Sequence, residues 1–173
     1  MKPTETLKHE HQVILLVLTA AETEARRRTN LDLGKAAQMA DFFRNFADKC
    51  HHAKEEGYLF PALVQRGMPQ DEGPIAVMLS EHNQGRAHVR AIFAELEKGT
   101  PDRMAVAADL EAFVDLLRAH IGKEDNVLFP MADELLTEQD QVGLEAEFER
   151  VEVEELGEGV HEKYHQLAHE LTA

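Results

Sequence analysis

The sequence predicts an all-α protein, an antiparallel up-down four-helix bundle followed by a short helical extension. Two observations carry this prediction. Apolar residues recur at spacings of three and four through nearly every segment of the 173 residues, whereas stretches that alternate apolar and polar residues are almost absent. Clusters rich in glycine and proline at residues 66–69, 73–74 and 99–101 divide this pattern into long segments joined by short connections.

The four bundle helices are expected at residues 4–28, 32–65, 75–98 and 101–136. Thr100 is expected to cap the fourth helix, with Pro101 as its first residue, because the N–H that proline lacks would have no helical partner there. Pro61 and Pro130 lie inside helical patterns, so each should bend or end its helix.

Residues 1–137 are predicted to form the bundle, and residues 138–173 a C-terminal helical extension packed on or beside it. The extension is strongly acidic, is interrupted by Gly157 and Gly159, and has no counterpart in the bundle. We expect it to be an appended helix pair. The total length is that of one domain with one core.

One spaced pattern occurs twice in the predicted bundle. A Glu-His pair is followed about forty residues later by His-x-x-x-Glu and then Leu-Phe-Pro. The offset between the copies is 71 residues for the Glu-His pair and 69 residues for the rest, so only the connecting stretch differs in length. The copies are Glu10-His11, His51-x-x-x-Glu55 and Leu59-Phe60-Pro61, then Glu81-His82, His120-x-x-x-Glu124 and Leu128-Phe129-Pro130.

The repeated residues are expected to face the bundle interior and to bind metal. In a helix, residues four apart share a face, so each His-x-x-x-Glu pair is a ready chelate. His120 continues an apolar stripe that includes Phe113 and Leu117. A carboxylate buried there needs a cation or an ion-pair partner. Imidazole with carboxylate suits iron and its neighbours, and the predicted ligands are His11, His51, Glu55, His82, His120 and Glu124.

The number of these ligands favours a two-metal centre. Two six-coordinate ions need about twelve bonds. Four histidines supply four, two bridging carboxylates supply four more, and an oxo or hydroxo bridge would add two. The remaining positions, about two, would be open to water or a small molecule. Zinc and manganese suit the same cage, and buried His–Glu pairs without metal are the alternative.

The residues outside the repeated set have their own expected positions and roles. His52 and Glu56 form an equally spaced pair, but the repeat partner of His52 is Ile121, so both are expected at the surface. Asp125 could approach the centre through a local bend, and Tyr58 could hydrogen-bond to one metal or bind it. Gly85 could clear space above the metal. A stripe at His161, His165 and His169 is expected to be solvated or to bind a further metal.

Charge and composition exclude several classes of partner. The formal net charge of −15 repels phosphate backbones and anionic membrane surfaces, so we expect neither nucleic acid nor a membrane as partner. No apolar run approaches the ~18 residues of a membrane span. A charged N-terminus without a secretory signal and a single cysteine, Cys50, are typical of a cytoplasmic protein.

These residues resemble the hemerythrin-like cation-binding proteins, the HHE family. The resemblance covers residues 7–136 and rests on His11, His51-x-x-x-Glu55, His82 and His120-x-x-x-Glu124, each His-x-x-x-Glu being followed by Leu-Phe-Pro. It implies a four-helix bundle around a non-haem di-iron centre with bridging carboxylates. The extension is similar to one common in bacterial members of the family.

Departures from the family pattern narrow the expected function. Oxygen-carrying hemerythrins have a fifth histidine one turn after the third-helix ligand, where this chain has Arg86. The ligand set is closer to the hemerythrin-like module of proteins that respond to nitric oxide and repair iron–sulfur clusters, but the N-terminal cysteine-containing domain of those proteins is not found here. Neither reversible oxygen carriage nor cluster repair is therefore the first expectation.

The leading hypothesis is a di-iron protein that binds O2, NO or H2O2, for sensing, storage or detoxification. If it turns over, it is an oxidoreductase acting on peroxide or nitric oxide. One alternative is a metal-dependent interaction or sensory module that acts through the acidic extension. The other is ferritin-like iron oxidation or storage, whose Glu-x-x-His motifs occur here only at Glu158 and Glu162, on one segment.

Overall fold

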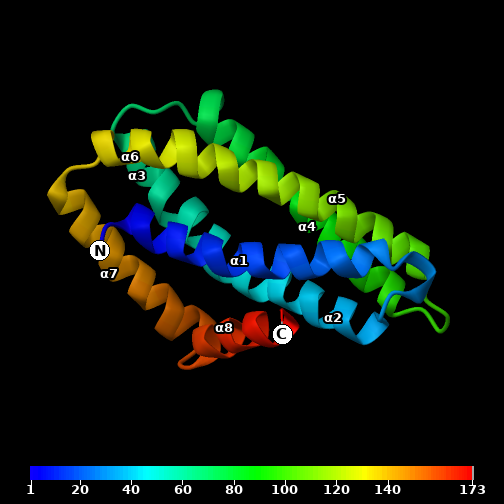
Figure 1. The fold of residues 1–173 in the computed structure, drawn as a ribbon. Coiled ribbons are helices and arrows are strands. Elements are labelled where there is room, and N and C mark those ends of the chain that lie inside the picture. Colours follow the sequence, from blue (N-terminus) through cyan, green and yellow to red (C-terminus); the bar gives the residue numbers. More distant parts are fainter. Residues whose placement is uncertain (173) are drawn as a thin grey trace.

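The computed structural model describes residues 1–172, and that range contains helices and no strand. Four long rods pack side by side (Figure 1). In chain order they are α1 (Pro3–Arg26); α2 (Leu33–Phe42) continuing to α3 (Phe60–Gln65); α4 (Gly73–Leu96); and α5 (Arg103–Lys123) continuing to α6 (Phe129–Leu135). A 3-10 turn at Arg28–Asn30 follows α1. The prediction of an all-α bundle is confirmed.

Wide π-helical turns run through the second and fourth rods next to the repeated residues. They span Phe43–His52 and Glu55–Leu59 in the second rod and Glu124–Leu128 in the fourth. Pro61 and Pro130 lie in the first turn of the α-helix that follows such a segment. Because proline lacks an N–H, the hydrogen bonding before it has to change, and a π turn accommodates the change. The prolines therefore do not end their helices.

The start of the fourth rod differs from the sequence prediction. Asp102, not Thr100, is the N-cap, and its carboxylate accepts hydrogen bonds from the backbone amides of Met104 and Ala105 at 3.0 and 3.4 Å. Asp is as good an N-cap as Thr or better, because its charged oxygen can satisfy two amides that have no helical partner. The helix consequently begins at Arg103.

Two apolar clusters fill the bundle. The larger contains Phe42, Phe43, Phe46 and Phe113, and the smaller contains Leu7, Leu59, Phe60 and Phe129. Along each rod, the residues of one cluster lie mainly before the inward histidine and those of the other mainly after it. A layer of buried histidine and glutamate therefore separates the two clusters and is enclosed by them.

The extension forms α7 (Glu138–Arg150), a π-helical turn (Val151–Leu156) and α8 (Val160–Leu171). Both helices pack on one side of the bundle, against α1, and α8 also contacts α2 (Figure 1). Tyr164 and Ala168 of α8 join the larger cluster, while Leu144 and Phe148 of α7 join the smaller. Among the described helices, none combines the length and the apolar character needed to span a membrane.

Candidate metal centre

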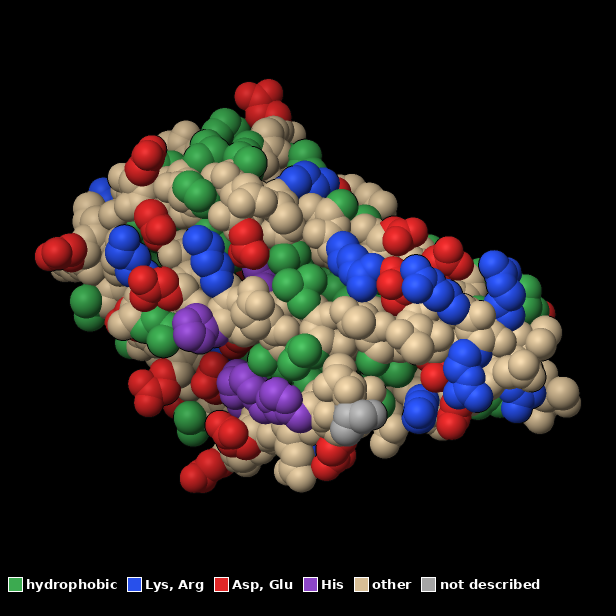
Figure 2. Space-filling model, viewed as in Figure 1, with side chains coloured by type: hydrophobic (Ala, Val, Ile, Leu, Met, Phe, Trp, Pro, Cys, Tyr) green, Lys and Arg blue, Asp and Glu red, His purple; other side chains and the backbone are tan. Residues whose placement is uncertain are grey.

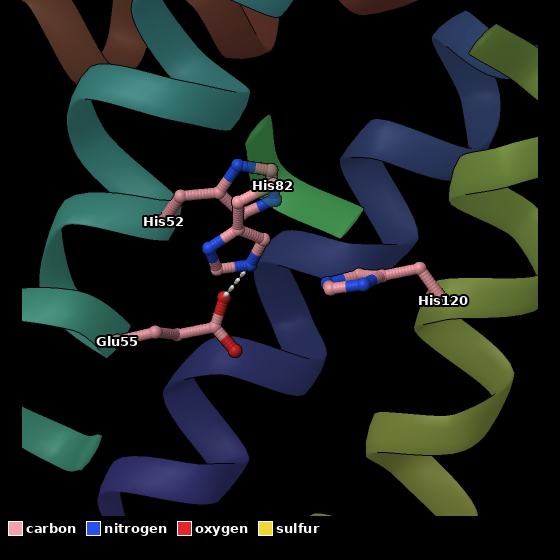
Figure 3. A group of neighbouring side chains, drawn as sticks. All are labelled: His52, Glu55, His82 and His120. Atoms are coloured by element: carbon pink, nitrogen blue, oxygen red, sulfur yellow. Dashed lines mark ion pairs between the residues drawn. The ribbon is translucent and has the colours of Figure 1, made fainter. Parts of the chain in front are cut away.

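The six predicted ligands all lie in the buried polar layer. His11 comes from α1, His51 and Glu55 from the second rod, His82 from α4, and His120 with Glu124 from the fourth rod; each side chain is at most 1% exposed. Potential ligand atoms of His11, His51 and Glu124 lie within 4.8 Å of one another, and so do those of His52, Glu55, His82 and His120. Figure 3 shows the second group pointing toward a common centre from three rods.

Each glutamate lies between histidines of the two groups. Glu124 Oε1 is 3.2 Å from both His11 Nε2 and His120 Nε2. Glu55 Oε1 is 3.6 Å from His51 Nε2 and 3.4 Å from His82 Nε2. None of these nitrogens or carboxylate oxygens has a hydrogen-bond partner, although all are buried. Buried polar atoms are normally paired, so this set fits one or two cations held between the carboxylates.

A second carboxylate holds the outer nitrogen of every inward histidine. Nδ1 of His51 lies 3.0 Å from Glu10 Oε1, and Nδ1 of His120 lies 3.0 Å from Glu81 Oε1. These are the glutamates of the repeated Glu-His pair, so each orients the histidine of the following rod. A carboxylate on Nδ1 places the proton there and leaves Nε2 free to bind metal.

The other two outer carboxylates also occupy matching positions in the repeat. Asp125 Oδ1 is 2.7 Å from His11 Nδ1, and Glu56 Oε2 is 2.6 Å from His82 Nδ1. Each directly follows an inward glutamate in the chain, and the two positions differ by the 69-residue offset. Glu56 was expected at the surface, but it is half-buried with its carboxylate directed at His82, so that prediction holds only in part. The acidic residue at both matching positions was the signal that sequence reasoning missed.

The surface assignment of His52 is also wrong, because its side chain is only 6% exposed. Its ring stacks on the His82 ring at 3.8 Å between centroids, and Nδ1 lies 3.3 Å from Asp48 Oδ1. Burial, followed by the nearby His82, holds the pKa of His52 well below its ordinary value, so the ring is neutral. Its repeat partner Ile121 is buried too. The position that His52 and Ile121 share in the repeat therefore faces the interior in both copies.

Tyr58 is not brought to the centre. It is half-buried and packs beside the smaller apolar cluster, and its hydroxyl contacts the guanidinium of Arg150 on α7. The sequence suggested a role for it because it lies seven residues after His51. The intervening π turns change the angular spacing along this rod, so the usual helical periodicity does not apply.

In the absence of metal, the two inward carboxylates of Glu55 and Glu124 lie too close together for both to carry a negative charge. Burial and the charge of Glu124 raise the pKa of the Glu55 carboxyl well above its ordinary value, because two carboxylates so close cannot both ionise without a cation. Burial lowers the pKa of His51 to about 4. His51 is therefore neutral at pH 7, which is the state that binds a metal ion.

One outer carboxylate links the centre to the extension. Glu10 Oε2 is 2.5 Å from the ammonium of Lys54, which lies 2.6 Å from Glu152 Oε1 in the turn between α7 and α8. Burial would raise the pKa of Glu10, but hydrogen bonding to His161 and His51 and the Lys54 charge bring it far below its ordinary value. Lys54 is fully buried.

The histidine stripe of the extension divides between half-buried and exposed positions. His161 Nε2 lies 3.5 Å from Glu10 Oε2, the rings of His161 and His165 are 4.5 Å apart, and His169 is exposed. Figure 2 shows histidines gathered on the face where α8 lies in Figure 1. His161 also neighbours Cys50 and Glu152 in a potential ligand group, but the Lys54 ammonium already pairs with both carboxylates there.

The comparison with protein families agrees with this geometry. The model of the hemerythrin HHE cation-binding domain matches residues 2–132, which include all six predicted ligands. The chain belongs to the hemerythrin HHE cation-binding family. As a member of this family it is a metal-binding protein, and the family implies iron.

Individual relatives of this hemerythrin-family chain include proteins with and without a stated role. An uncharacterized protein of Mycobacterium tuberculosis is 27% identical over 161 residues, covering 89% of this chain and 62% of the relative. The iron-sulfur cluster repair protein YtfE of Salmonella newport is 31% identical over 133 residues, covering 72% of this chain and 60% of the relative. The chain thus matches less than two thirds of these relatives' lengths. No solved structure matches it.

Proposed function

We propose that this chain is a non-haem di-iron protein that binds a small diatomic or peroxide ligand, O2, NO or H2O2, for sensing, storage or detoxification. One observation carries the proposal. Four imidazole nitrogens and four carboxylate oxygens point into one buried layer without a hydrogen-bond partner: His11, His51, His82 and His120 Nε2, and both oxygens of Glu55 and of Glu124.

This donor set suits two ions better than one. Each glutamate lies between histidines from the two groups, as carboxylates that bridge two metals would. An oxo or hydroxo bridge would complete most of the remaining coordination. The family and the similarity to proteins named for iron–sulfur cluster repair support iron, while zinc and manganese accept the same ligand atoms.

Iron bound here would supply redox chemistry and open coordination positions for the small ligand. The protein supplies the surroundings. Apolar clusters on both sides of the polar layer exclude water, and the four outer carboxylates fix the orientation of the imidazoles. His52 donates Nδ1–H toward Asp48 and keeps Nε2 unprotonated, so it adds a neutral hydrogen-bond acceptor at one side of the centre.

The first test is the metal content of protein produced with ample iron. We expect about two irons per chain in the wild type and a large loss in His120→Ala, which removes one inward nitrogen. His169→Ala, an exposed histidine of α8, is the matched control and should keep its iron. Little iron in the wild type, or equal iron in His120→Ala, would contradict a di-iron centre.

Ligand identity is tested on the iron-loaded protein. Addition of O2, NO or peroxide should change the visible absorption spectrum of the wild type, and the order of affinities would identify the ligand. Turnover, measured as peroxide or NO consumed in the presence of a reductant, would make the protein an oxidoreductase. A spectrum unchanged by all three ligands would contradict small-ligand binding while leaving the metal content intact.

A metal-dependent sensory or interaction module is supported by a different observation. Glu10 contacts both His51 and Lys54, and Lys54 contacts Glu152 of the extension. A change at the centre can therefore reach the surface through two charged contacts. Hydrogen exchange of α7 and α8 with and without metal tests this function; identical exchange would contradict it.

A further inference from the structure

A cavity of about 330 Å³ opens between α4, α5 and the Phe43–His52 segment. Its walls are largely apolar and include Phe43, Val89, Phe113 and Leu117. Gly85 helps to keep it open, because a Cβ atom at this position would lie 3.3 Å from Phe113 Cε2. The volume is at the lower end of the range for small-molecule sites and far exceeds what a diatomic ligand needs.

The inner end of the cavity reaches the metal centre. His52 and His82 both line it, and their rings are the stacked pair in Figure 3. The remainder of the cavity is bounded by residues outside the predicted ligand set. A molecule bound there would therefore lie beside the centre without depending on the metal for most of its contacts.

The outer part of the cavity is positively charged. Arg86 and Arg90 project from α4 on one wall, and Arg44 and Lys49 from the opposite segment on the other. Four of the chain's 18 basic residues thus meet at one opening in a protein whose net charge is −15. Such a focus of one sign raises the local concentration of ligands of the opposite sign.

The acidic residues near the cavity neutralise Arg86, which pairs with Asp48 and Glu56, but within residues 1–172 they leave Lys49 and Arg90 unpaired. Asp48 is paired with Arg86 at 2.9 Å, and Glu81 is paired with Lys123 and with His120. Lys49 and Arg90 are both exposed and form no ion pair among the described residues. They remain as two cations, one on each side of the opening.

We propose that this cavity binds a small organic monocarboxylate with an apolar body, of the medium-chain fatty acid type. The hydrocarbon part packs against Phe43, Val89 and Phe113, and the carboxylate lies between Lys49 and Arg90. Apolar walls exclude a small hydrophilic anion as the preferred ligand, and the cationic opening disfavours a neutral hydrocarbon. The proposal is independent of the small ligand assigned to the metals.

The test uses octanoate as the probe and octan-1-ol as its neutral counterpart, with binding to the full chain measured by titration calorimetry before and after removal of metal by a chelator. We expect octanoate to bind in both states and octan-1-ol to bind more weakly. The double variant Lys49→Glu/Arg90→Glu should weaken octanoate at least about tenfold, which corresponds to about 1.4 kcal/mol. Both positions are exposed, so the variant should fold, as circular dichroism will show.

Two matched controls separate the effects of the cationic opening and of the cavity walls from general effects of net charge and of glycine substitution. Lys35→Glu/Lys98→Glu changes net charge equally at exposed sites remote from the cavity and should leave octanoate affinity unchanged. Gly85→Ala should weaken octanoate, whereas Gly122→Ala, at a helical glycine with open space around it, should not.

Three results would overturn the proposal. They are no binding of octanoate to the wild type, binding of octan-1-ol as tight as that of octanoate, and wild-type affinity for octanoate in Lys49→Glu/Arg90→Glu. Binding that requires metal and is unchanged in Lys49→Glu/Arg90→Glu would place the carboxylate on the metal. That result would also overturn the proposal. Iron content is measured separately, so failure here is distinguishable from failure of the di-iron proposal.

Discussion

At the scale of single residues, His11 differs from the other inward histidines because two carboxylates contact it. Asp125 lies on its Nδ1 and Glu124 on its Nε2. Burial opposes protonation, but hydrogen bonding to Asp125 and the nearby charges of Glu124 and Asp125 outweigh it and raise the pKa of His11 to about 9 in the metal-free protein. A proton on this ring places a positive charge between the carboxylates of Asp125 and Glu124.

This shift predicts a pH dependence of metal-free stability. A folded-state pKa of about 9, above the ordinary 6.5, means that the contribution of His11 is complete below pH 6.5 and is lost as the pH rises through 9. We expect up to roughly 3 kcal/mol of unfolding free energy to be lost over this window. Urea denaturation of chelated protein at each pH measures it.

Variants assign that pH dependence to one ring. His11→Gln should remove this part of the slope, while His9→Gln, an exposed histidine of the same helix, should keep the wild-type slope. An unchanged slope in His11→Gln would show that the proton resides elsewhere in the polar layer.

The repeat located residues more accurately than it assigned their roles. It placed the six predicted ligands in the interior, because helical spacing and matching positions are properties of the chain itself. It misplaced His52, because an apolar repeat partner such as Ile121 does not mark a surface position, and it missed the contact of Glu56 with His82, although the repeat partner of Glu56, Asp125, is also acidic. Ile121, the partner of His52, is buried for the same reason that His52 is: both positions face the interior.

At the scale of elements, the π-helical turns and the extension are the features that shape the centre. The turns occur beside His51, Glu55 and Glu124, so local widening of the helix sets how these side chains enter the polar layer. The extension supplies Glu152, which pairs with the fully buried Lys54. Without that partner and Glu10, the ammonium would be an uncompensated buried charge.

Removing the Lys54 charge should destabilise both the extension and the contact of Glu10 with His51. Lys54→Met leaves Glu10 buried without its cation, which costs about 3–5 kcal/mol of unfolding free energy. Lys49→Met, an exposed lysine of the same rod, should cost little. Chemical denaturation measures both values, and limited proteolysis near Gly157 reports release of the extension.

Should Lys54→Met not fold, Glu152→Gln provides the measurable variant. It keeps the Lys54–Glu10 contact and removes only the half-buried partner, so a smaller loss of stability and easier cleavage near Gly157 are expected. Stability and cleavage equal to the wild type in Glu152→Gln would contradict this role for the extension.

At the scale of the whole molecule, the two copies of the repeat share one centre. Glu124 of the second copy lies against His11 of the first, and Glu55 of the first lies against His82 of the second. Neither half contains a complete set of ligands around either carboxylate. Metal binding should therefore tie all four rods together.

This sharing predicts that metal stabilises the entire bundle. Ligand that binds only the folded state adds about 4 kcal/mol at a concentration one thousand times Kd. Adding zinc, which has no redox chemistry, to chelated protein should raise its melting temperature and the protection of amides in all four rods. Glu55→Gln/Glu124→Gln should lose this response; a wild-type response in that variant would contradict coordination by the shared glutamates.

The sequence by itself determined the helices, their approximate ends and the inward positions of the six predicted ligands. These follow from periodicity and from glycine and proline, which act over a few residues. Tertiary structure decided which carboxylate holds which imidazole, as in Glu10 with His51 and Asp125 with His11, which are 41 and 114 residues apart. It also decided that Tyr58 faces Arg150 and that four cations surround a cavity, because these contacts depend on how the rods pack.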